Sequence, residues 1–311
     1  MDARVLEWFL RVAEVGSINR AATSLPMSQP ALSRHIAALE HEMGVALFVR
    51  TQGGVRLTEP GRLLADRARP LLRQFAQLKE EVSDTAAGQL SIGIPPSWRQ
   101  VFTANFLHGM LANHPGIKLR VHEGVSHALR DLLLGGSLDL GLVPVDPATA
   151  TGLEQTPLLR EPLIVVGPAA ARFDPGAPIP AEALGEHKLI MPARPNVLRL
   201  QVEQAMRRHG LIPRVVVETD TLALCLDLAR QGEGWTVVPA CSVSGGVPNA
   251  SVSWGPLRGV ELTWALFENT ARSHSPAVRQ ARRLMLATLR DTLAAGRWFG
   301  AEGLADLAAP S

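Results

Sequence analysis

One short stretch of this sequence combines side chains that can hydrogen-bond to nucleic-acid bases. The stretch carries Ser28, Gln29, Ser33 and Arg34, with Pro30 on the same face. Apolar residues recur at helical spacing from Leu32 to Met43, so the polar residues share the opposite face of one predicted helix. A glutamine can pair bidentately with adenine, an arginine with guanine or phosphate, and a serine with either. The stretch therefore predicts a helix that reads base edges in a major groove.

Two earlier helices and a turn are predicted to hold this helix. Apolar residues at helical spacing predict a first helix that stops at Gly16-Ser17, and small residues around Ala21 predict a second. Leu25-Pro26-Met27-Ser28 forms the turn. Ser28 fits the N-cap of the third helix, and Pro30 fits its first turn, where a missing N–H costs little.

A small β-hairpin is predicted after the third helix. Residues 48–51 and 55–58 are β-prone, and Gln52-Gly53-Gly54 between them is typical of a hairpin turn. Arg50 and Arg56 would place cations beside the DNA backbone, as a wing does. A three-helix bundle with a hairpin and no DNA-binding role is the alternative. The agreement of turn, cap, polar face and hairpin favours the DNA-binding interpretation.

The segment resembles the N-terminal domain of LysR-type transcriptional regulators. The matching residues are Ala21-Ala22, Ser28-Gln29-Pro30-Ala31-Leu32-Ser33, Ile36, Leu39-Glu40, Gly44-Val45, Leu47-Phe48, Arg50-Thr51 and Leu57-Thr58-Glu59-Pro60-Gly61. The resemblance extends over the chain in length and layout, with specific motifs confined to residues 1–61. Ile18-Asn19 replaces the commoner aromatic-threonine pair, and Pro26 sits in the turn, but Asn19 can still donate to a phosphate.

The expected partner of this domain is double-stranded DNA with a partly palindromic operator, because a two-fold dimer reads two half-sites. The predicted DNA-binding residues are Asn19, Arg20, Ser28, Gln29, Pro30, Ser33, Arg34, Arg50 and Thr51. The formal net charge of the whole chain is only +2, so DNA affinity must come from a localised site and from pairing of two chains.

Residues 59–88 are predicted to form a linker helix and a hinge. Leu64, Ala68, Leu71, Phe75, Leu78 and Val82 follow a heptad spacing. This spacing is typical of a helix that pairs with another helix, although a helix packed on its own domain is the alternative. Pro70 should kink or interrupt it. The contacts predicted from this spacing are Leu64, Leu71, Phe75 and Leu78. The resemblance also places a dimerising helix here and implies a homotetramer.

Strand-like and helix-like runs alternate twice between residues 89 and 295, which predicts two α/β lobes of parallel sheet covered by helices. The predicted elements include a helix near 98–113 and strands at 163–166 and 260–267. The resemblance implies a periplasmic-binding-protein-like effector domain over residues 89–311, after a winged helix-turn-helix at residues 1–58. Lobe I is expected at about 89–161 and 266–295, and lobe II at about 162–265. Crossings near 160–163 and 262–268 are the expected hinges, and the tail from Gly296 is left unassigned.

A ligand cleft is expected between the lobes, because ligands of open α/β sheets bind at the carboxyl ends of strands, where helix N-termini point inward. The predicted effector-binding residues are Ser97, Trp98, Ser126, Arg194, Asn196 and Thr221. Ser97 and Asn196 also fit N-caps, and Arg194 offers a positive charge. This chemistry favours a small organic anion. Each polar residue could instead be only a helix cap, and Arg194 only a surface charge.

Catalytic, metal and cofactor sites are not predicted. The run His122-Glu123-Gly124-Val125-Ser126-His127 has one residue too many for the His-Glu-x-x-His zinc motif, and neither Gly-x-Ser-x-Gly nor a phosphate-binding Gly-Lys-Ser/Thr occurs. The two cysteines suggest a reducing compartment rather than a disulfide scaffold. Cys225 lies in an apolar helical run, and Cys241, after a strand, is expected to be the more exposed thiol.

We therefore expect a cytoplasmic, ligand-responsive transcription regulator that is not an enzyme and has no membrane partner. Effector binding would change lobe closure and the spacing of the DNA-binding heads, and RNA polymerase is a further candidate partner. The alternative is a solute-binding protein or an enzyme with an accessory DNA-binding-like head. The sequence shows no signal-peptide pattern, which argues against the first, and no nucleophile–base or metal set, which argues against the second.

Overall fold

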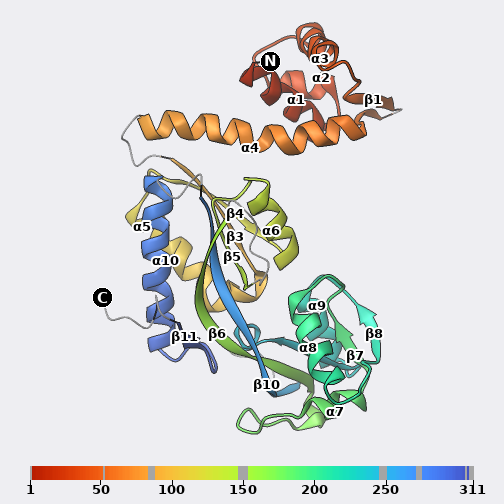
Figure 1. The fold of residues 1–311 in the computed structure, drawn as a ribbon, viewed down its shortest axis with the longest axis vertical. Coiled ribbons are helices and arrows are strands. Elements are labelled where there is room, and N and C mark those ends of the chain that lie inside the picture. The colour runs from red at the N-terminus through yellow and green to blue at the C-terminus, as the bar shows by residue number, and fades with distance from the viewer. Residues whose placement is uncertain are drawn as a thin grey trace. The chain divides into compact units, whose positions relative to one another are not determined.

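The computed structural model describes residues 2–51, 53–82, 88–145, 153–244, 251–270, 275–304 and 307, without the side chains of 73, 74 and 76–82. The chain divides into two compact units, drawn in Figure 1. One comprises Met1–Gly88 with Gly135–Ser137, and the other Gln89–Leu134 with Leu138–Ser311. Each unit has its own hydrophobic core and is described by itself.

The N-terminal unit contains the predicted three helices, hairpin and linker helix. They are α1 (Ala3–Val15), α2 (Ile18–Thr23), α3 (Gln29–Met43), β1 (Phe48–Thr51), β2 (Gly54–Leu57) and α4 (Glu59–Val82). Asp2 caps α1, and Gly16 ends it in the left-handed region at φ 66°. The apolar faces of α1 and α3 meet in a core around Phe9, Leu32 and Leu39, so the opposite face of α3 is left for solvent.

Two glycines allow the hairpin to pack closely on this core. Gly54 has φ 139°, and a Cβ there would lie 2.1 Å from the carbonyl oxygen of Gly16, so the position requires glycine. A Cβ on Gly61, in the first turn of α4, would lie 2.1 Å from the carbonyl oxygen of Leu47. The hairpin and the start of α4 are therefore fixed against the core by backbone approaches that side chains would block.

Helix α4 runs through Pro70 without interruption, so an interruption at this proline is ruled out and the kink stays a prediction. A proline removes one backbone hydrogen bond. On its N-terminal side, Ala65 and Ala68 are buried in the core of the unit, which anchors that part of the helix. The heptad seam is therefore shared: Ala68 packs within its own unit, whereas Leu71 and Phe75 are 49% and 66% exposed. The side chain of Leu78 lies outside the described residues.

The C-terminal unit is built on one mixed sheet whose strands follow the order β4-β3-β5-β10-β6-β9-β7-β8, with β11 paired to β6. The strands are β3 (Gln89–Ile94), β4 (Lys118–Glu123), β5 (Leu140–Pro144), β6 (Leu153–Pro168), β7 (Leu189–Met191), β8 (Val215–Glu218), β9 (Trp235–Pro239), β10 (Val252–Asn269) and β11 (Glu302–Gly303). Strands β3, β4 and β5 pair in parallel, as do β7, β8 and β9, which agrees with the prediction. The strand at 163–166 was also expected to be parallel, but it belongs to β6 and pairs antiparallel with β9; β5–β10 and β10–β6 are antiparallel too.

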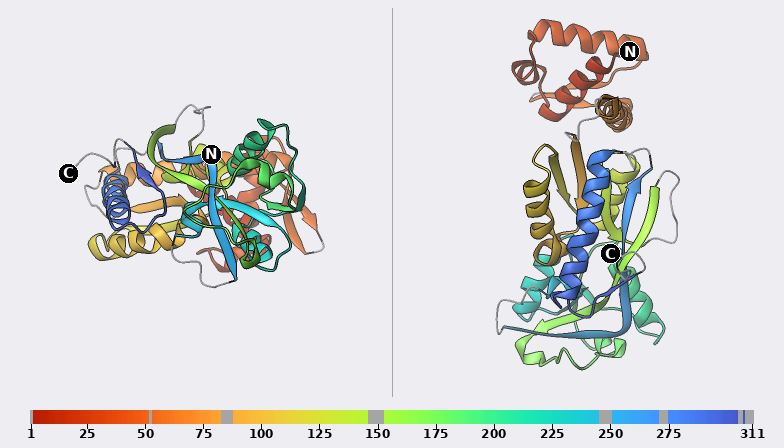
Figure 2. Two further views of the ribbon diagram at one scale, coloured as in Figure 1. Left: turned by 90° about the horizontal axis from the view of Figure 1, so that it is seen from below. Right: turned by 90° about the vertical axis from the view of Figure 1, so that its left-hand side faces the viewer.

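Helices cover both faces of this sheet. They are the 3-10 turns η1 (Pro96–Trp98), η3 (Ala169–Ala171) and η4 (Ala240–Ser242), the π-helix η2 (Arg99–Thr103), and the helices α5 (Ala104–Asn113), α6 (Ser126–Leu134), α7 (Ala181–Gly185), α8 (Val197–Arg207), α9 (Leu222–Arg230) and α10 (Pro276–Ala294). In Figures 1 and 2, α5 and α10 lie side by side on one face of β3–β5, and α6 lies on the other. A single helix near 98–113 was expected; the structure divides it into η1, η2 and α5.

Strands β6 and β10 join the two lobes and are much longer than expected. The sequence predicted strands only at 163–166 and 260–267, whereas β6 spans Leu153–Pro168 and β10 spans Val252–Asn269. Both run through the two lobes, side by side, in Figure 1. Their register shifts between Pro256 and Glu261. Each strand passes from one environment to another, so no single hydrophobic period marks its length.

The tail after α10 also takes part in this fold. β11 pairs with β6 at Arg160 and Leu159, and Trp298 is only 3% exposed. The sequence left this segment unassigned. No helix in the described residues has the length and apolar character needed to cross a bilayer.

Candidate functional site

The polar face of α3 is exposed in the N-terminal unit. Ser28, Gln29, Pro30 and Arg34 are exposed and Ser33 is half-buried, while Leu32, Ile36 and Leu39 on the other side are buried. The structure therefore places the five predicted residues of this stretch on one accessible surface. Ser28 occupies the N-cap position, but its side chain makes no capping hydrogen bond, so the expected cap is wrong in that detail.

The other predicted DNA-binding residues are exposed on α2 and β1. Asn19 and Arg20 lie in α2, and Arg50 and Thr51 lie in β1. The guanidinium of Arg20 donates to the carbonyl oxygen of Val15 at 2.9 Å. The carboxylate of Glu40, in α3, accepts from the backbone N–H groups of Leu47 and Phe48 at 2.7 and 3.0 Å. This contact fixes the start of the hairpin against the helix that precedes it.

A cavity of about 590 Å³ lies in the C-terminal unit and is lined by residues of both lobes. Ser97 and Ser126 line it from lobe I, and Asn196 and Thr221 line it from lobe II. The structure thus brings four of the six predicted effector-binding residues together. Gln100, Cys241, Ser242 and Trp264 are among the lining residues that the sequence did not single out.

Three helix N-termini meet at this cavity. α6 begins at Ser126, and Asn196 and Thr221 are the N-cap residues of α8 and α9. The Asn196 side chain accepts from the backbone N–H groups of Leu198 and Arg199 at 3.0 and 3.4 Å. Thr221 makes no side-chain cap, and Ser97 lies within η1, whose N-cap is Pro95, so the expected cap at Ser97 is wrong. Each helix N-terminus carries a partial positive charge and backbone N–H donors.

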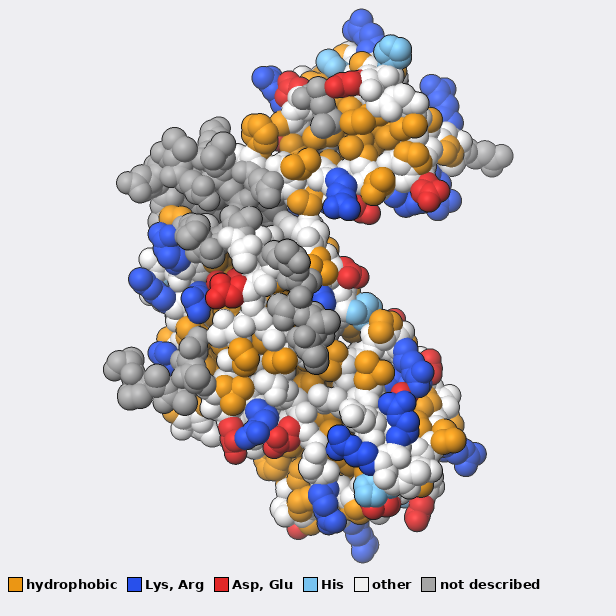
Figure 3. Space-filling view, in the orientation of Figure 1, with side chains coloured by type: hydrophobic (Ala, Val, Ile, Leu, Met, Phe, Trp, Pro, Cys, Tyr) orange, Lys and Arg blue, Asp and Glu red, His pale blue; other side chains and the backbone are white. Residues whose placement is uncertain are grey.

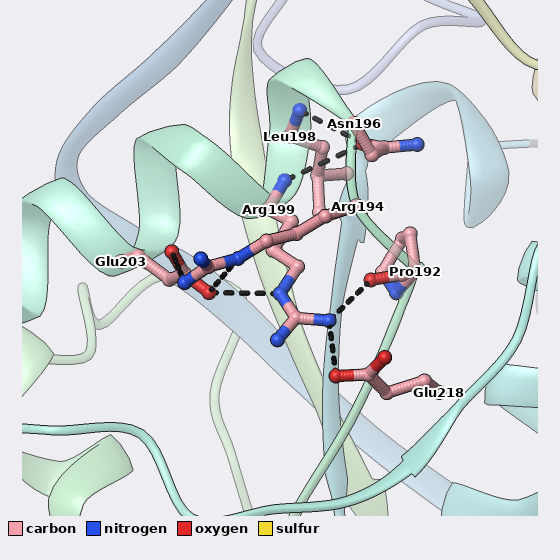
Figure 4. Close-up of polar contacts among 7 residues, drawn as sticks. All are labelled: Pro192, Arg194, Asn196, Leu198, Arg199, Glu203 and Glu218. Carbon is pink, nitrogen blue, oxygen red and sulfur yellow. Dashed lines mark hydrogen bonds and ion pairs between the residues drawn. The ribbon is translucent and has the colours of Figure 1, made fainter.

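Arg194 does not line the cavity, contrary to the sequence prediction. Its guanidinium is paired with Glu203, with Nη2 at 2.6 Å from Oε2 and Nε at 3.3 Å from Oε1 (Figure 4). The Glu203 side chain is 4% exposed, and a buried carboxylate is stabilised by a cationic partner. The Arg194 side chain therefore extends toward Glu203 on α8 instead of toward the cavity. Sequence spacing placed Arg194 near the helix N-terminus but could not show this partner.

Arg199 completes the ion-pair network of Figure 4. It donates to Glu203 at 2.8 Å, to the carbonyl oxygen of Pro192 at 3.1 Å and to Glu218 at 2.7 Å. Burial raises the pKa of Glu203, but hydrogen bonds from Arg194 and Arg199 outweigh it and hold that pKa below its usual value. The network ties α8 to the strand end before it and to β8, and so fixes the α8 N-terminus at the cavity.

Trp98 is a core residue rather than a lining residue. It is fully buried, with its ring 4.8 Å from that of Trp298 and 5.2 Å from that of Trp264, both in edge-on contact. A large aromatic ring beside a strand end fits an apolar core as well as a ligand site, so the sequence could not separate the two roles.

Cys241 is buried at 1% exposure, so the expectation of an exposed thiol is wrong. It follows β9 in η4, where the sheet and η1 cover it. Burial and the neighbouring Glu161 carboxylate raise the pKa of the Cys241 thiol. Cys225 is buried as expected, and burial raises its pKa to about 11. No cluster of three or more His, Cys, Asp or Glu side chains able to hold a metal ion occurs within the described residues.

Glu161 is a further residue near the cavity that sequence inspection missed. Its side chain is fully buried in β6, where it accepts from the backbone N–H of Cys241 at 2.6 Å and from the Trp298 indole at 2.7 Å. The indole of Trp264 donates to its other oxygen. A glutamate in a mixed polar and apolar strand carries no signal of burial, because its donors come from β10, η4 and the C-terminal tail.

Comparison with known proteins agrees with this two-unit layout. Residues 3–62 match the model of the bacterial regulatory helix-turn-helix protein, lysR family, and residues 83–290 match the LysR substrate binding domain. The nitrogen assimilation regulatory protein nac of Klebsiella aerogenes is 30% identical over 293 residues, which cover 92% of this chain and 95% of that protein. A probable hydrogen peroxide-inducible genes activator of Streptomyces viridosporus is 33% identical over 242 residues, or 76% and 77% of the two chains.

Solved structures show the same fold. The full-length regulator CbnR, crystallised with its target DNA, aligns over 94% of this chain and all of that chain with a TM-score of 0.69 at 21% identity. A helix-turn-helix unit followed by a two-lobed binding domain defines a DNA-binding transcription regulator that responds to a ligand. This chain belongs to the LysR family of such regulators.

Proposed function

We propose that this regulator is a cytoplasmic, non-enzymatic protein that binds a partly palindromic operator as a dimer, assembles into a homotetramer and responds to a small organic anion. Residues 1–58 would bind DNA, residues 59–88 would pair the chains, and residues 89–311 would sense the effector. RNA polymerase would be a further partner.

DNA binding is supported by the exposed face of α3. Ser33 lies about one helical turn after Gln29, and Arg34 follows it directly; side chains of these three types can hydrogen-bond to base edges. Asn19 and Arg20 on α2, and Arg50 and Thr51 on β1, would contact the phosphate backbone on either side. The structural relative CbnR was crystallised with target DNA, which agrees with this arrangement.

Pairing through α4 is supported by its exposed apolar side chains. Leu63, Leu71 and Phe75 are 62%, 49% and 66% exposed, and Figure 3 shows hydrophobic side chains gathered on one face of the N-terminal unit. Leu64 packs partly on its own core, so its role in pairing would be shared. An exposed apolar surface of this kind on a long helix is typical of a helix pair.

An anionic effector is supported above all by the three helix N-termini at the cavity. The backbone N–H groups and partial positive charges of α6, α8 and α9 point to one place, and hydroxyl groups of Ser97, Ser126 and Thr221 lie among them. A cavity of about 590 Å³ fits a small organic molecule. Arg194 contributes no charge to it, because its guanidinium is committed to Glu203.

Hydrogen peroxide, which gives one relative its name, is a poor candidate for the effector here. A reactive thiol needs exposure and a lowered pKa. Both described cysteines are buried, and burial raises the pKa of each.

The proposal is tested by measuring operator binding and ligand binding on the full chain. Wild type should shift its own upstream DNA, and a panel of aromatic and aliphatic carboxylates should include at least one that raises the melting temperature. A carboxylate that stabilises wild type should stabilise Ser97→Ala less and Arg194→Ala equally. If the neutral amide of that acid stabilises wild type as strongly as the acid, the effector is not recognised as an anion.

A further inference from the structure

A buried carboxylate, that of Glu161, lies directly behind the residues that line the cavity. Cys241 and Trp264 both line the cavity, and both donate to Glu161 behind them: the Cys241 backbone N–H at 2.6 Å, and the Trp264 indole. Glu161 is 0% exposed and therefore lies one residue deep beneath the surface that a ligand would touch. It also lies in β6, one of the two strands that connect the lobes.

Every described hydrogen-bond donor to this carboxylate is neutral. Two N–H groups, from Cys241 and Trp298, meet Oε2, and one, from Trp264, meets Oε1. The Cys241 thiol also hydrogen-bonds to this carboxylate, and as a neutral group it adds no positive charge. A buried negative charge without a cationic partner is costly, and protonation is the usual relief.

The charged groups around Glu161 do not neutralise it. The adjacent Arg160 is exposed on the other face of β6, where it pairs with Glu261 of β10 at 3.2 Å and with Glu302 of β11 at 2.8 Å. Arg99 of η2 is paired with Glu123 of β4. On η4, the neighbouring titratable group is the thiol of Cys241. Burial raises the pKa of Glu161 to about 7, against the opposing effect of its hydrogen bonds from Trp298, Trp264 and Cys241.

We propose that the cavity binds a monoanionic carboxylate together with one proton, and that Glu161 accepts this proton. The proposal rests on the anionic effector proposed above and names its charge class. The proton comes from solvent and ends on a carboxyl oxygen of Glu161, with no bond of the ligand made or broken. A second negative charge one residue from Glu161 favours its neutral form, so the ligand and the proton bind cooperatively.

The charges on the cavity surface favour one negative charge rather than two. Among the described lining residues, Arg99 and Asp220 are the charged ones, and Arg99 is committed to Glu123. The positive potential therefore comes from the helix N-termini alone, each equivalent to about half an elementary charge. Three such termini together amount to about one and a half elementary charges, which compensate a monoanion fully and a dianion only in part.

The pH dependence follows from linkage. Below the pKa of Glu161 in the free protein, the group is already protonated, and the affinity for a monoanion is at its highest. Above about pH 7, binding requires proton uptake, so the affinity should fall by roughly tenfold per pH unit until the pKa of the complex is reached.

Isothermal titration calorimetry of the full chain tests this inference. The probes are benzoate and pentanoate as monoanions, phthalate and succinate as dianions, and benzamide as a neutral analogue. At pH 8, titrations in HEPES and in Tris, which differ in enthalpy of ionisation, give the number of protons bound per ligand. We expect close to one proton per bound monoanion, and weaker binding of the dianions by tenfold or more.

Variants then assign the proton to its group. Glu161→Gln should abolish proton uptake and flatten the pH dependence of affinity, whereas Glu268→Gln, at another buried carboxylate that does not line the cavity, should retain both. The two-buffer measurement on wild type decides the coupling even if Glu161→Gln fails to fold. Monoanion binding at pH 8 without proton uptake, or equal affinity for phthalate and benzoate, overturns this inference and leaves the anionic effector intact. Failure of all four carboxylates to bind at pH 6 overturns both.

Discussion

The surface proposed to bind DNA and the cavity proposed to bind the effector are built in opposite ways. The first comes from one continuous stretch: the exposed side chains of α3 follow each other within a few residues, and their roles depend on exposure alone. The second assembles Ser97, Ser126, Asn196 and Thr221 from four segments that only the sheet brings together. The difference teaches that a local site is set by its own exposed side chains, whereas an assembled site also depends on buried residues that never touch the ligand.

The largest effect of a single substitution should be on the pairing of two chains through α4. Phe75→Glu would place a charge in the proposed α4 seam, at a cost of about 3–5 kcal/mol for an unpaired buried charge. We expect light scattering to show loss of pairing and operator affinity to fall by more than about a hundredfold. Phe75→Leu, which keeps an apolar side chain, is the matched control. A wild-type chain that is monomeric at micromolar concentration would contradict the α4 seam.

The second-largest effect should come from the ion-pair network of Arg199 and Glu203, which holds the α8 N-terminus at the cavity. Arg199→Ala leaves the 4%-exposed Glu203 with Arg194 as its remaining described cationic partner, and we expect the free energy of unfolding to fall by about 3 kcal/mol. Urea unfolding followed by tryptophan fluorescence measures it. The folded pKa of Glu203 is lowered, so this stabilisation is complete above about pH 5 and disappears as the pH falls through the folded pKa.

Arg230→Ala is the control for Arg199→Ala. Arg230 pairs with Asp227 at 2.7 Å, but the two side chains are 35% and 53% exposed, so the loss should stay below about 1 kcal/mol. Equal losses for the two arginines would show that burial does not set the strength of the Arg199 network.

Single residues of the recognition face should have an intermediate effect on DNA binding and none on effector binding. Gln29→Ala and Arg34→Ala should each lose about 1–3 kcal/mol of specific operator binding per head. Fluorescence anisotropy with operator and scrambled DNA separates the specific part. Arg11→Ala, whose guanidinium bonds to Ser24 on the same unit, serves as the control. Wild-type affinity in both recognition variants would disprove the assignment of this face.

The smallest effect should come from a single hydroxyl at the cavity. Ser97→Ala should weaken a stabilising carboxylate by about 0.5–1.5 kcal/mol, or roughly two- to tenfold, because one hydrogen bond is lost. Arg194→Ala should change the half-maximal concentration by less than about twofold, because its guanidinium binds Glu203 instead of the cavity. If Arg194→Ala weakened ligand binding more than Ser97→Ala, Arg194 would have to be a ligand-binding residue.

The sequence by itself determined the N-terminal unit and the alternation of the lobes. Helical spacing from Leu32 to Met43, the glycines at 16 and 44, and the hairpin turn are local signals, and each described helix of that unit lies where they indicate. Strand ends followed by capping residues also located Ser126, Asn196 and Thr221 at the cavity, because parallel strands of one sheet end on the same side.

Only the tertiary structure decided which charges and rings face the cavity. Arg194 turns to Glu203, Trp98 enters the core, Cys241 is covered, and Glu161 receives donors that are 80, 103 and 137 residues away. A helix period or a turn depends on neighbours in the chain. The partner of a buried charge depends on long-range packing, because the cost of desolvation is felt only when distant segments close around it.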